Sequence, residues 1–365
     1  MNEKSLRIYV SSGPLDMHEM LSDALVKLGF DSWTEKENRD LNQADVIIFI
    51  SDTVGLNLLE RYNLVGSRRP IVILWLVDPL PPLDLSERAS RYALSASKVN
   101  WQYLCGNVLG RFVHKYVPFA RELRSIIRSV YLRRLAKEMT LRNPAYGDCP
   151  TREWGRVVRR YRLFIDYMNQ GLIDYVFTTT VAKKEFIINL GFHAEFIPFG
   201  YHSIFGQLQG HKRDIDVLFL GRLNNERRRR VIDRLFDELQ ANGVELMVIE
   251  RDYYSQGRTE LLNRTKIMLN LLRVPWDFGP ERFLMSMSCG ALVVSEKIMK
   301  PELYQPGVHF AQAETTELAS IICQYLENDN EREKITRRAY EFVTGELQLE
   351  KNVSQLLKRC HLSDT

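Results

Sequence analysis

The sequence predicts an α/β protein with two Rossmann-like domains that face each other across a cleft. Three observations lead to this prediction: short apolar runs alternate with helical patterns in the first half, a polar, glycine-containing stretch follows at 200–214, and a second alternation comes after it. Parallel sheets covered by helices on both faces produce this alternation. We therefore expect a first domain over 1–205, a second over 206–345, and a C-terminal helix over 346–365 that packs back on the first.

Each predicted strand is an apolar run bounded by turn residues. In the first domain the strands are expected at 6–13, 44–51, 69–79, 174–180 and 194–200, with helices at 17–30 and 181–191. In the second they are expected at 217–220, 244–250, 265–274 and 291–296, with helices at 226–243 and 280–289. Open α/β sheets bind ligands beyond the carboxyl ends of their strands, so the residues just after each strand are the first candidates for a site.

Composition and charge are those of an ordinary soluble globular protein. Of 365 residues 45% are hydrophobic, and 50 basic against 46 acidic residues give a net charge of only +4, so attraction to phosphates must come from local clusters. No nucleic-acid-binding motif is present, and we expect no nucleic-acid partner. Five widely spaced cysteines favour neither a disulfide framework nor a zinc site. Without a signal-peptide pattern or a long apolar run, we expect a cytoplasmic protein.

The stretch "LFLGRLNNERRRR" has the features of a diphosphate site. A strand ends at Gly221, Arg222 follows at its carboxyl edge, and Arg227 and Arg228 come five and six residues later in a run of arginines. Glycine lets backbone N–H groups approach an anion, and guanidinium groups match phosphate oxygens. The alternative is that the arginines form the solvated face of a surface helix, which is our interpretation of Arg229 and Arg230.

A short helix between Gly279 and Gly290 is the second candidate element. Pro280 suits the first helical position and Gly290 the position after the last turn. Asp277, Glu281 and Arg282 gather at the N-terminal end, which should point into the cleft. Met285 lies one turn after Glu281 on the same face. The alternative is that Glu281 only complements the helix dipole and Met285 is a core residue.

Polar residues also follow other strands of the second domain. Glu296 ends an apolar strand, Glu250 and Arg251 follow another, and Arg273 follows a third. Carboxylates at such positions can accept hydrogen bonds from ligand hydroxyls. Together these residues should line one side of the cleft, as expected for a phosphorylated ligand rich in hydroxyl groups.

Two residues of the first domain are candidates for a general base. Asp16 and His18 lie near the start of the first helix, after the first strand and a Gly-Pro turn. A base at this edge could accept the proton of an acceptor hydroxyl. The alternatives are that Asp16 caps the helix and that His18 is structural.

The segment 110–137 interleaves basic and apolar residues at helical spacing. One apolar and one basic face result, which suits contact with anionic lipid or with an anionic acceptor. The alternative is a helix that faces the core and has a solvated basic side. We retain peripheral membrane contact through this segment as a hypothesis, at the inner face of the membrane.

The second half resembles the GT-B glycosyltransferases, nearest the CgeB-like spore-maturation group. The resemblance covers roughly 170–345 and is carried by "IPFGYHSIF", "DIDVLFLGRL" and "RFLMSMSCGALVVSE". It implies a nucleotide-sugar donor bound mainly to the second domain, its diphosphate meeting the arginines at the positions of Arg222 and Arg227. In the family two acidic residues eight positions apart commonly contact the donor sugar and ribose. These positions fall here on Asp277 and Met285, so the second carboxylate is missing, although Glu281 and Glu296 are near enough to substitute.

We therefore expect a glycosyltransferase that moves a hexosyl group from a nucleotide-diphosphate sugar, such as a UDP- or GDP-sugar, to a glycan, lipid or small-molecule acceptor. Positioning of the donor and stabilisation of the departing diphosphate would supply the catalysis, with no metal and no cofactor beyond the sugar nucleotide. One alternative is a non-catalytic nucleotide- or glycan-binding protein of the same fold. Another is an enzyme of similar fold that epimerises or hydrolyses sugar nucleotides.

Overall fold

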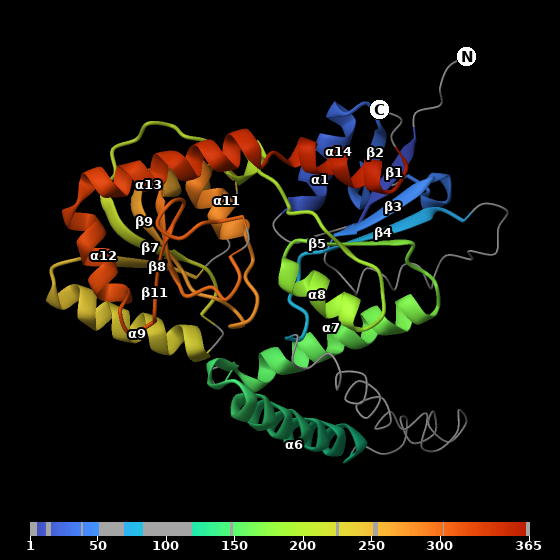
Figure 1. The fold of residues 1–365 in the computed structure, drawn as a ribbon, viewed down its shortest axis with the longest axis horizontal. Coiled ribbons are helices and arrows are strands. Elements are labelled where there is room, and N and C mark those ends of the chain that lie inside the picture. Colours follow the sequence, from blue (N-terminus) through green and yellow to red (C-terminus); the bar gives the residue numbers. More distant parts are fainter. Residues whose placement is uncertain are drawn as a thin grey trace.

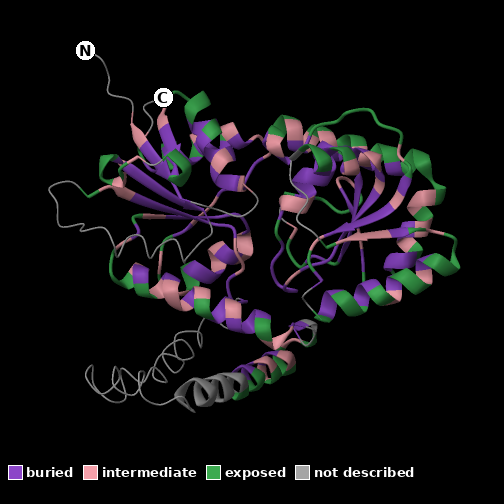
Figure 2. Ribbon diagram, turned by 180° about the vertical axis from the view of Figure 1, so that it is seen from behind, coloured by how far each residue is buried: buried purple, intermediate pink, exposed green. Residues whose placement is uncertain are grey.

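A computed structural model of the chain describes residues 6–11, 16–37, 39–50, 69–82, 119–146, 149–223, 226–250, 255–301 and 303–362. Figure 1 shows two lobes, each built around its own parallel sheet. Figure 2 shows that buried residues fill the strands and the inner faces of the helices in both lobes. The predicted α/β class with two Rossmann-like domains is confirmed.

The first sheet has six parallel strands in the order β2-β1-β3-β4-β5-β6. Successive side chains point to opposite faces, so Ile8 and Val10 pack against one layer of helices while Tyr9 packs against the other. One layer contains α1 and the C-terminal helix α14, Leu349–Arg359, and the other contains α7 and α8 (Figure 1). The elements of this lobe are β1 Arg7–Val10, α1 Met17–Lys27, β2 Asp31–Thr34, β3 Val46–Ile50, β4 Ile71–Leu76, α6 Phe119–Arg142, α7 Thr151–Asn169, β5 Tyr175–Thr178, α8 Val181–Asn189 and β6 Glu195–Phe196.

The second sheet has five parallel strands in the order β11-β10-β9-β7-β8. This order places β9 beside β7, so residues that follow these two strands meet at one edge although they are far apart in sequence. The elements of this lobe are β7 Ile215–Leu220, α9 Glu226–Ala241, β8 Leu246–Ile249, α10 Ser255–Arg264, β9 Thr265–Asn270, α11 Glu281–Ser288, β10 Leu292–Glu296, β11 Ala311–Ala313, α12 Leu318–Glu327 and α13 Asp329–Glu341.

The chain crosses between the lobes twice, and the two crossings pair with each other. The outgoing segment carries Tyr201, whose N–H donates to the carbonyl oxygen of Leu347 at 2.6 Å, while the N–H of Leu349 donates back to Tyr201 at 2.9 Å. The returning segment continues into α14, Leu349–Arg359, which contacts α1 of the first lobe. Figure 1 shows α13 and α14 running along one side of both lobes. The C-terminal helix thus joins the first lobe's core.

Gly200 is expected to be intolerant of any side chain, because the two crossings touch there. A Cβ at this position would lie 2.6 Å from backbone atoms of Gln348 and Leu349, and backbone cannot move aside as a flexible side chain can. Gly200→Ala should lower the free energy of unfolding by about 1–3 kcal/mol, the usual cost of overpacking. Gly345→Ala is the control, since a Cβ there meets nothing within 4 Å. Equal melting temperatures for the two variants would contradict the tight crossing.

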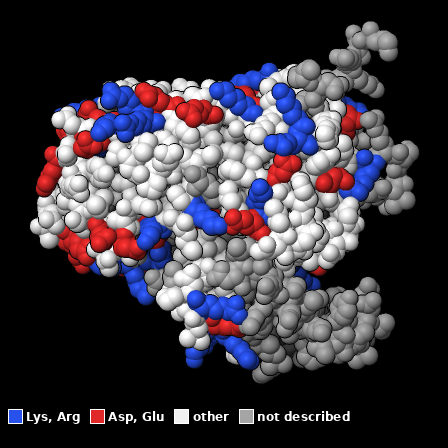
Figure 3. Space-filling view, viewed as in Figure 1, with Lys and Arg blue, Asp and Glu red and all other residues white. Residues whose placement is uncertain are grey.

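Charges of both signs are intermixed on the face shown in Figure 3, often as neighbouring pairs. None of the helices in the described parts of the chain has the length and hydropathy needed to cross a bilayer. Of the basic segment 110–137, residues 110–118 lie outside the described part, and the remainder belongs to α6. Val130 on α6 is 60% exposed and Leu141 is 79% exposed. Membrane contact through this segment stays a prediction.

Candidate active site

The carboxyl edge of the second sheet is organised around Arg282. Its Nε donates to the carbonyl oxygen of Leu220 at 3.1 Å, and its Nη1 donates to Asn270 Oδ1 at 3.2 Å, so one guanidinium joins the ends of β7 and β9. Gly221 follows β7 with a φ of 154°, and a Cβ there would lie 2.5 Å from Arg282 Nη2. Glycine is therefore required at 221 so that the guanidinium can lie against the backbone.

Arg227 and Glu296, both predicted as donor-binding residues, bind each other. The two guanidinium nitrogens donate to the two carboxylate oxygens, with Nη1 to Oε1 at 2.9 Å, and both side chains are more than 90% buried. The backbone N–H of Leu272 also donates to Glu296. The pair holds the start of α9 to the end of β10, and its charges neutralise each other.

Three further guanidinium groups crowd the same edge. Arg228 is buried, and its Nε donates to the carbonyl oxygen of Leu272 at 3.2 Å. Burial holds the pKa of Arg228 well below its ordinary value, and the charges of Arg282 and Arg273 lower it further. Burial also lowers the pKa of Arg282, with Arg273 again adding to the effect. Like charges held together at a strand edge in this way favour the binding of an anion.

Helix α11 begins beside this cluster and buries Met285. The helix starts at Glu281, one residue later than predicted, with Pro280 as the residue before the first turn. Met285 is 6% exposed and belongs to the apolar cluster that α11 shares with its sheet. Gly290 follows the helix with a φ of 72°, as the sequence predicts. Glu281 is half-buried, and burial raises the pKa of its carboxyl, with Asp78 of the first lobe adding to the rise.

Asp277 belongs to the second lobe, yet its charged partner belongs to the first. Its Oδ2 lies 3.1 Å from Lys183 Nζ, and the two side chains are 3% and 2% exposed. Thr180, the residue before α8, donates its hydroxyl to Asp277 Oδ1 at 3.0 Å instead of capping its own helix. The carboxylate thus lies at the positive N-terminal end of α8. Burial nevertheless raises the pKa of Asp277 above its ordinary value.

Neighbouring residues of the β9–α11 segment also reach the first lobe. Trp276 donates its indole N–H to the carbonyl oxygen of Leu80 at 2.8 Å, and its ring centroid lies 4.5 Å from that of Trp154. Arg273 donates to Glu153 at 2.9 Å, a carboxylate that also pairs with Arg156. The segment therefore attaches the second lobe to α7, α8 and the end of β4. The two lobes are in direct contact along this segment.

Comparisons with known proteins bear on the fold of the chain. Residues 225–358 match a protein-family model described as glycosyl transferase-like. The sucrose-phosphate synthase of Thermosynechococcus elongatus superposes with a TM-score of 0.56 at 10% identity, over 99% of this chain and 100% of that chain. The fold is GT-B.

Two other solved structures align with lower scores. HepE of Anabaena, solved in complex with UDP-glucose, gives a TM-score of 0.46 at 12% identity over 98% of this chain and 99% of that chain. TarM gives 0.46 at 12% identity over 55% of this chain, which spans 45% of TarM. A comparison with curated protein sequences gave no match. The CgeB-like group stays a prediction.

Within the GT-B fold, the remaining predicted residues fall into three places. Arg222 and Glu250 are exposed at the carboxyl edge, where Glu250 accepts from the N–H of Leu223 at 3.4 Å. Asp16 and His18 lie at the start of α1 in the first lobe; Asp16 has a φ of 59° and makes no capping hydrogen bond through its side chain, and His18 is buried. Arg251 lies outside the described residues.

Three residues at this site were not predicted from the sequence: Lys183, Thr180 and Glu153. Lys183 and Thr180 follow β5, so the rule that ligands gather after strands could have found them. Glu153 lies within a helix and gives no such signal.

Proposed function

We propose that this protein is a glycosyltransferase that moves a hexosyl group from a nucleotide-diphosphate sugar to an acceptor bound in the cleft. The observation that carries the proposal is the group of guanidinium charges from Arg228, Arg273 and Arg282 at the carboxyl edge of the second sheet. A diphosphate placed there relieves their mutual repulsion. The GT-B fold and the glycosyl transferase-like match of 225–358 support the assignment.

The diphosphate would lie over Gly221, in contact with Arg222 and the outer nitrogen of Arg282. Arg222 is exposed at this edge and can turn toward an anion, whereas Arg282 is fixed by its bonds to Leu220 and Asn270. Arg227 remains part of the surface that faces the diphosphate, and Glu296 fixes the orientation of its guanidinium group. From the sequence alone, Arg227 and Glu296 were both expected to contact the donor directly.

Catalysis would rest on position and charge. The guanidinium groups stabilise the negative charge that develops on the departing diphosphate, so we propose transfer without a metal ion. Asp277 and Glu281 lie beside this position at the start of α11, where carboxylates can accept hydrogen bonds from the hydroxyls of the donor sugar. Glycans, lipids and small molecules are the candidate acceptors, and α6 is the candidate contact with anionic lipid.

Arg222→Ala is expected to weaken binding of UDP or GDP by about tenfold or more. A hydrogen bond between charged groups contributes about 1.5–3 kcal/mol, and each 1.4 kcal/mol is tenfold in affinity. The melting temperature should change little because Arg222 is exposed. Isothermal titration calorimetry measures the affinity.

The matched control is Arg230→Ala, which removes an exposed arginine from α9 in the same run of arginines. It should bind nucleoside diphosphates as the wild type does. If Arg222→Ala and Arg230→Ala have the same affinity as the wild type for both UDP and GDP, Arg222 does not contact the diphosphate. If the wild type binds neither nucleotide, the proposed function fails as a whole.

The second candidate is a non-catalytic nucleotide- or glycan-binding protein of the same fold. The observation that favours it is the burial of Met285 where the resembling enzymes carry a carboxylate, together with the engagement of Glu296 by Arg227. A panel of nucleotide sugars separates the candidates. Slow hydrolysis of one donor, or transfer to an added acceptor, supports the enzyme, and binding without turnover supports the alternative.

A further inference from the structure

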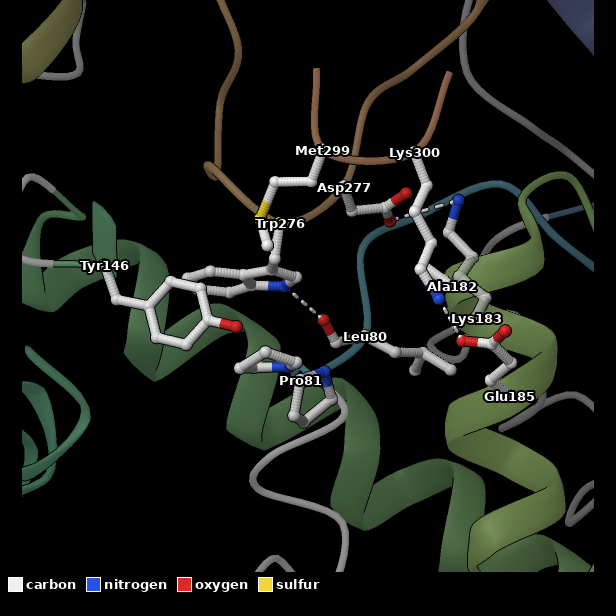
Figure 4. Close-up of a pocket in the computed structure, with 11 residues that line it drawn as sticks. Leu80, Pro81, Tyr146, Ala182, Lys183, Glu185, Trp276, Asp277, Met299 and Lys300 are labelled. Atoms are coloured by element: carbon white, nitrogen blue, oxygen red, sulfur yellow. Dashed lines mark hydrogen bonds and ion pairs between the residues drawn. The ribbon is translucent and has the colours of Figure 1, made fainter. Parts of the chain in front are cut away.

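A pocket between the lobes, lined in part by the Lys183–Asp277 ion pair, shares Asp277 with the donor site described above. Its volume is about 130 Å³, room for roughly four water molecules. Both lobes contribute to its wall, as Figure 4 shows: Leu80, Pro81 and Pro82 come from the segment after β4, and Trp276 and Met299 from the second lobe. One small ring fits this volume.

The walls of the pocket are apolar and rigid. The indole of Trp276 is fixed by its bond to the Leu80 carbonyl and by contact with Trp154, and it is only 7% exposed. The proline rings have no rotatable side chain, and Met299, which is 51% exposed, lies beside Trp276 in the pocket wall (Figure 4). Walls of this kind match the C–H face of a pyranose ring, which is flat and apolar.

The charges that line the pocket cancel. Two lysines and two carboxylates contribute, and they form two pairs, Lys183 with Asp277 and Lys300 with Glu185 (Figure 4). A pocket with both cations already paired offers little to a phosphate or a carboxylate. Both oxygens of the buried Asp277 carboxylate face groups of the first lobe, Oδ1 the Thr180 hydroxyl and Oδ2 the Lys183 ammonium.

We propose that this pocket binds the acceptor, and that the acceptor presents one uncharged pyranose ring there. The proposal rests on the proposed function, because it takes the donor site to lie at the neighbouring edge of the second sheet. Donor and acceptor sites then differ in charge: excess guanidinium groups meet the diphosphate, while a neutral, apolar pocket meets the sugar ring. The acceptor hydroxyl points toward the segment that carries Trp276 and Asp277, which also borders the donor edge.

The test measures binding of methyl glycosides of glucose, galactose, mannose and N-acetylglucosamine by saturation-transfer NMR, with glucose 6-phosphate and glucuronate as charged probes. We expect at least one neutral glycoside to bind, at least fivefold more tightly than either charged probe. Met299→Trp puts a larger ring into the pocket wall and should weaken that binding tenfold or more. Leu303→Trp adds the same ring at a residue that is 37% exposed outside the pocket, and it should leave binding unchanged.

A charge reversal provides an independent variant. Glu185→Lys leaves the walls intact and gives the pocket a net positive charge, so glucose 6-phosphate should bind at least as well as the neutral glycosides. The inference is overturned if no neutral glycoside binds the wild type, if charged probes bind it equally well, or if Met299→Trp binds like Leu303→Trp. Calorimetry with UDP and GDP on the same samples separates the two proposals: glycoside binding without nucleotide binding removes the proposed transferase, and the reverse removes the acceptor pocket.

Discussion

Lys183→Met is expected to destabilise the closed arrangement of the two lobes by about 3–5 kcal/mol, the usual effect of removing one partner from a buried ion pair. Both side chains of the Lys183–Asp277 pair are at least 97% buried, so Asp277 would be left as a charge without a cation or solvent. Urea unfolding followed by tryptophan fluorescence measures the loss. The signal is informative because Trp276 lies next to Asp277, at the point where the lobes join.

The loss should depend on pH in a defined direction. Burial raises the pKa of Asp277, and Lys183 opposes that rise. An acid with a raised pKa in the folded state contributes stability below its ordinary pKa, and that contribution is lost as the pH rises through the raised value. Without Lys183 the pKa rises further. Lys183→Met should therefore be destabilised more at pH 8 than at pH 5.5, where a larger share of Asp277 is protonated.

A double variant separates the ion pair from simple loss of volume. Lys183→Met with Asp277→Asn removes both charges and keeps an acceptor for the Thr180 hydroxyl, so most of the lost stability should return. Lys184→Met, one residue along α8, is the control. If the double variant is as unstable as Lys183→Met, the lysine does not act by balancing the charge on Asp277. The same conclusion follows if Lys183→Met loses the same free energy of unfolding at both pH values.

Met285→Glu is expected to lower the free energy of unfolding by about 3–4 kcal/mol at pH 7. The side chain is 6% exposed and surrounded by apolar neighbours, so a glutamate there stays protonated. Keeping it protonated at pH 7 costs about 1.4 kcal/mol for each pH unit above its ordinary pKa near 4.3. The destabilisation should therefore shrink as the pH falls toward 4. Met285→Leu conserves volume and is the control, with an expected loss below about 1.5 kcal/mol.

The matching functional variant is Glu281→Gln, because Glu281 precedes Met285 by one turn and lies between the lobes near Lys183 and Asp78. If Glu281 has taken over the missing carboxylate's role, the variant should lose roughly tenfold or more in donor affinity or turnover, with little change in melting temperature. Glu296→Gln is less selective, since it also breaks the pair with Arg227. If Met285→Glu is stable and raises transferase activity while Glu281→Gln has no effect, the donor site has lost its carboxylate. That result would favour the non-catalytic binding protein.

Several residues of the candidate donor edge could be predicted because the sequence patterns that mark them extend over only a few positions. Gly221, Arg222 and Arg282 were predicted from their places after a strand or at a helix start, and all three lie at the carboxyl edge of the second sheet. The burial of Met285 and the left-handed Gly290 also follow from short-range pattern. The roles of these residues toward a ligand remain predictions, to be tested by the variants above.

Local patterns in the sequence are enough to predict the two α/β domains and the residues that stand after each strand, because apolar periodicity and turn residues act over a few positions. Which of these residues meet depends on the tertiary structure. Arg227 and Glu296 are 69 positions apart in the sequence and pair because the first turn of α9 lies in space beside the end of β10. Lys183 and Asp277 pair because the lobes close on each other. Partners of this kind depend on strand order and on domain placement, which are set by burial summed over whole sheets and leave no trace in the local spacing.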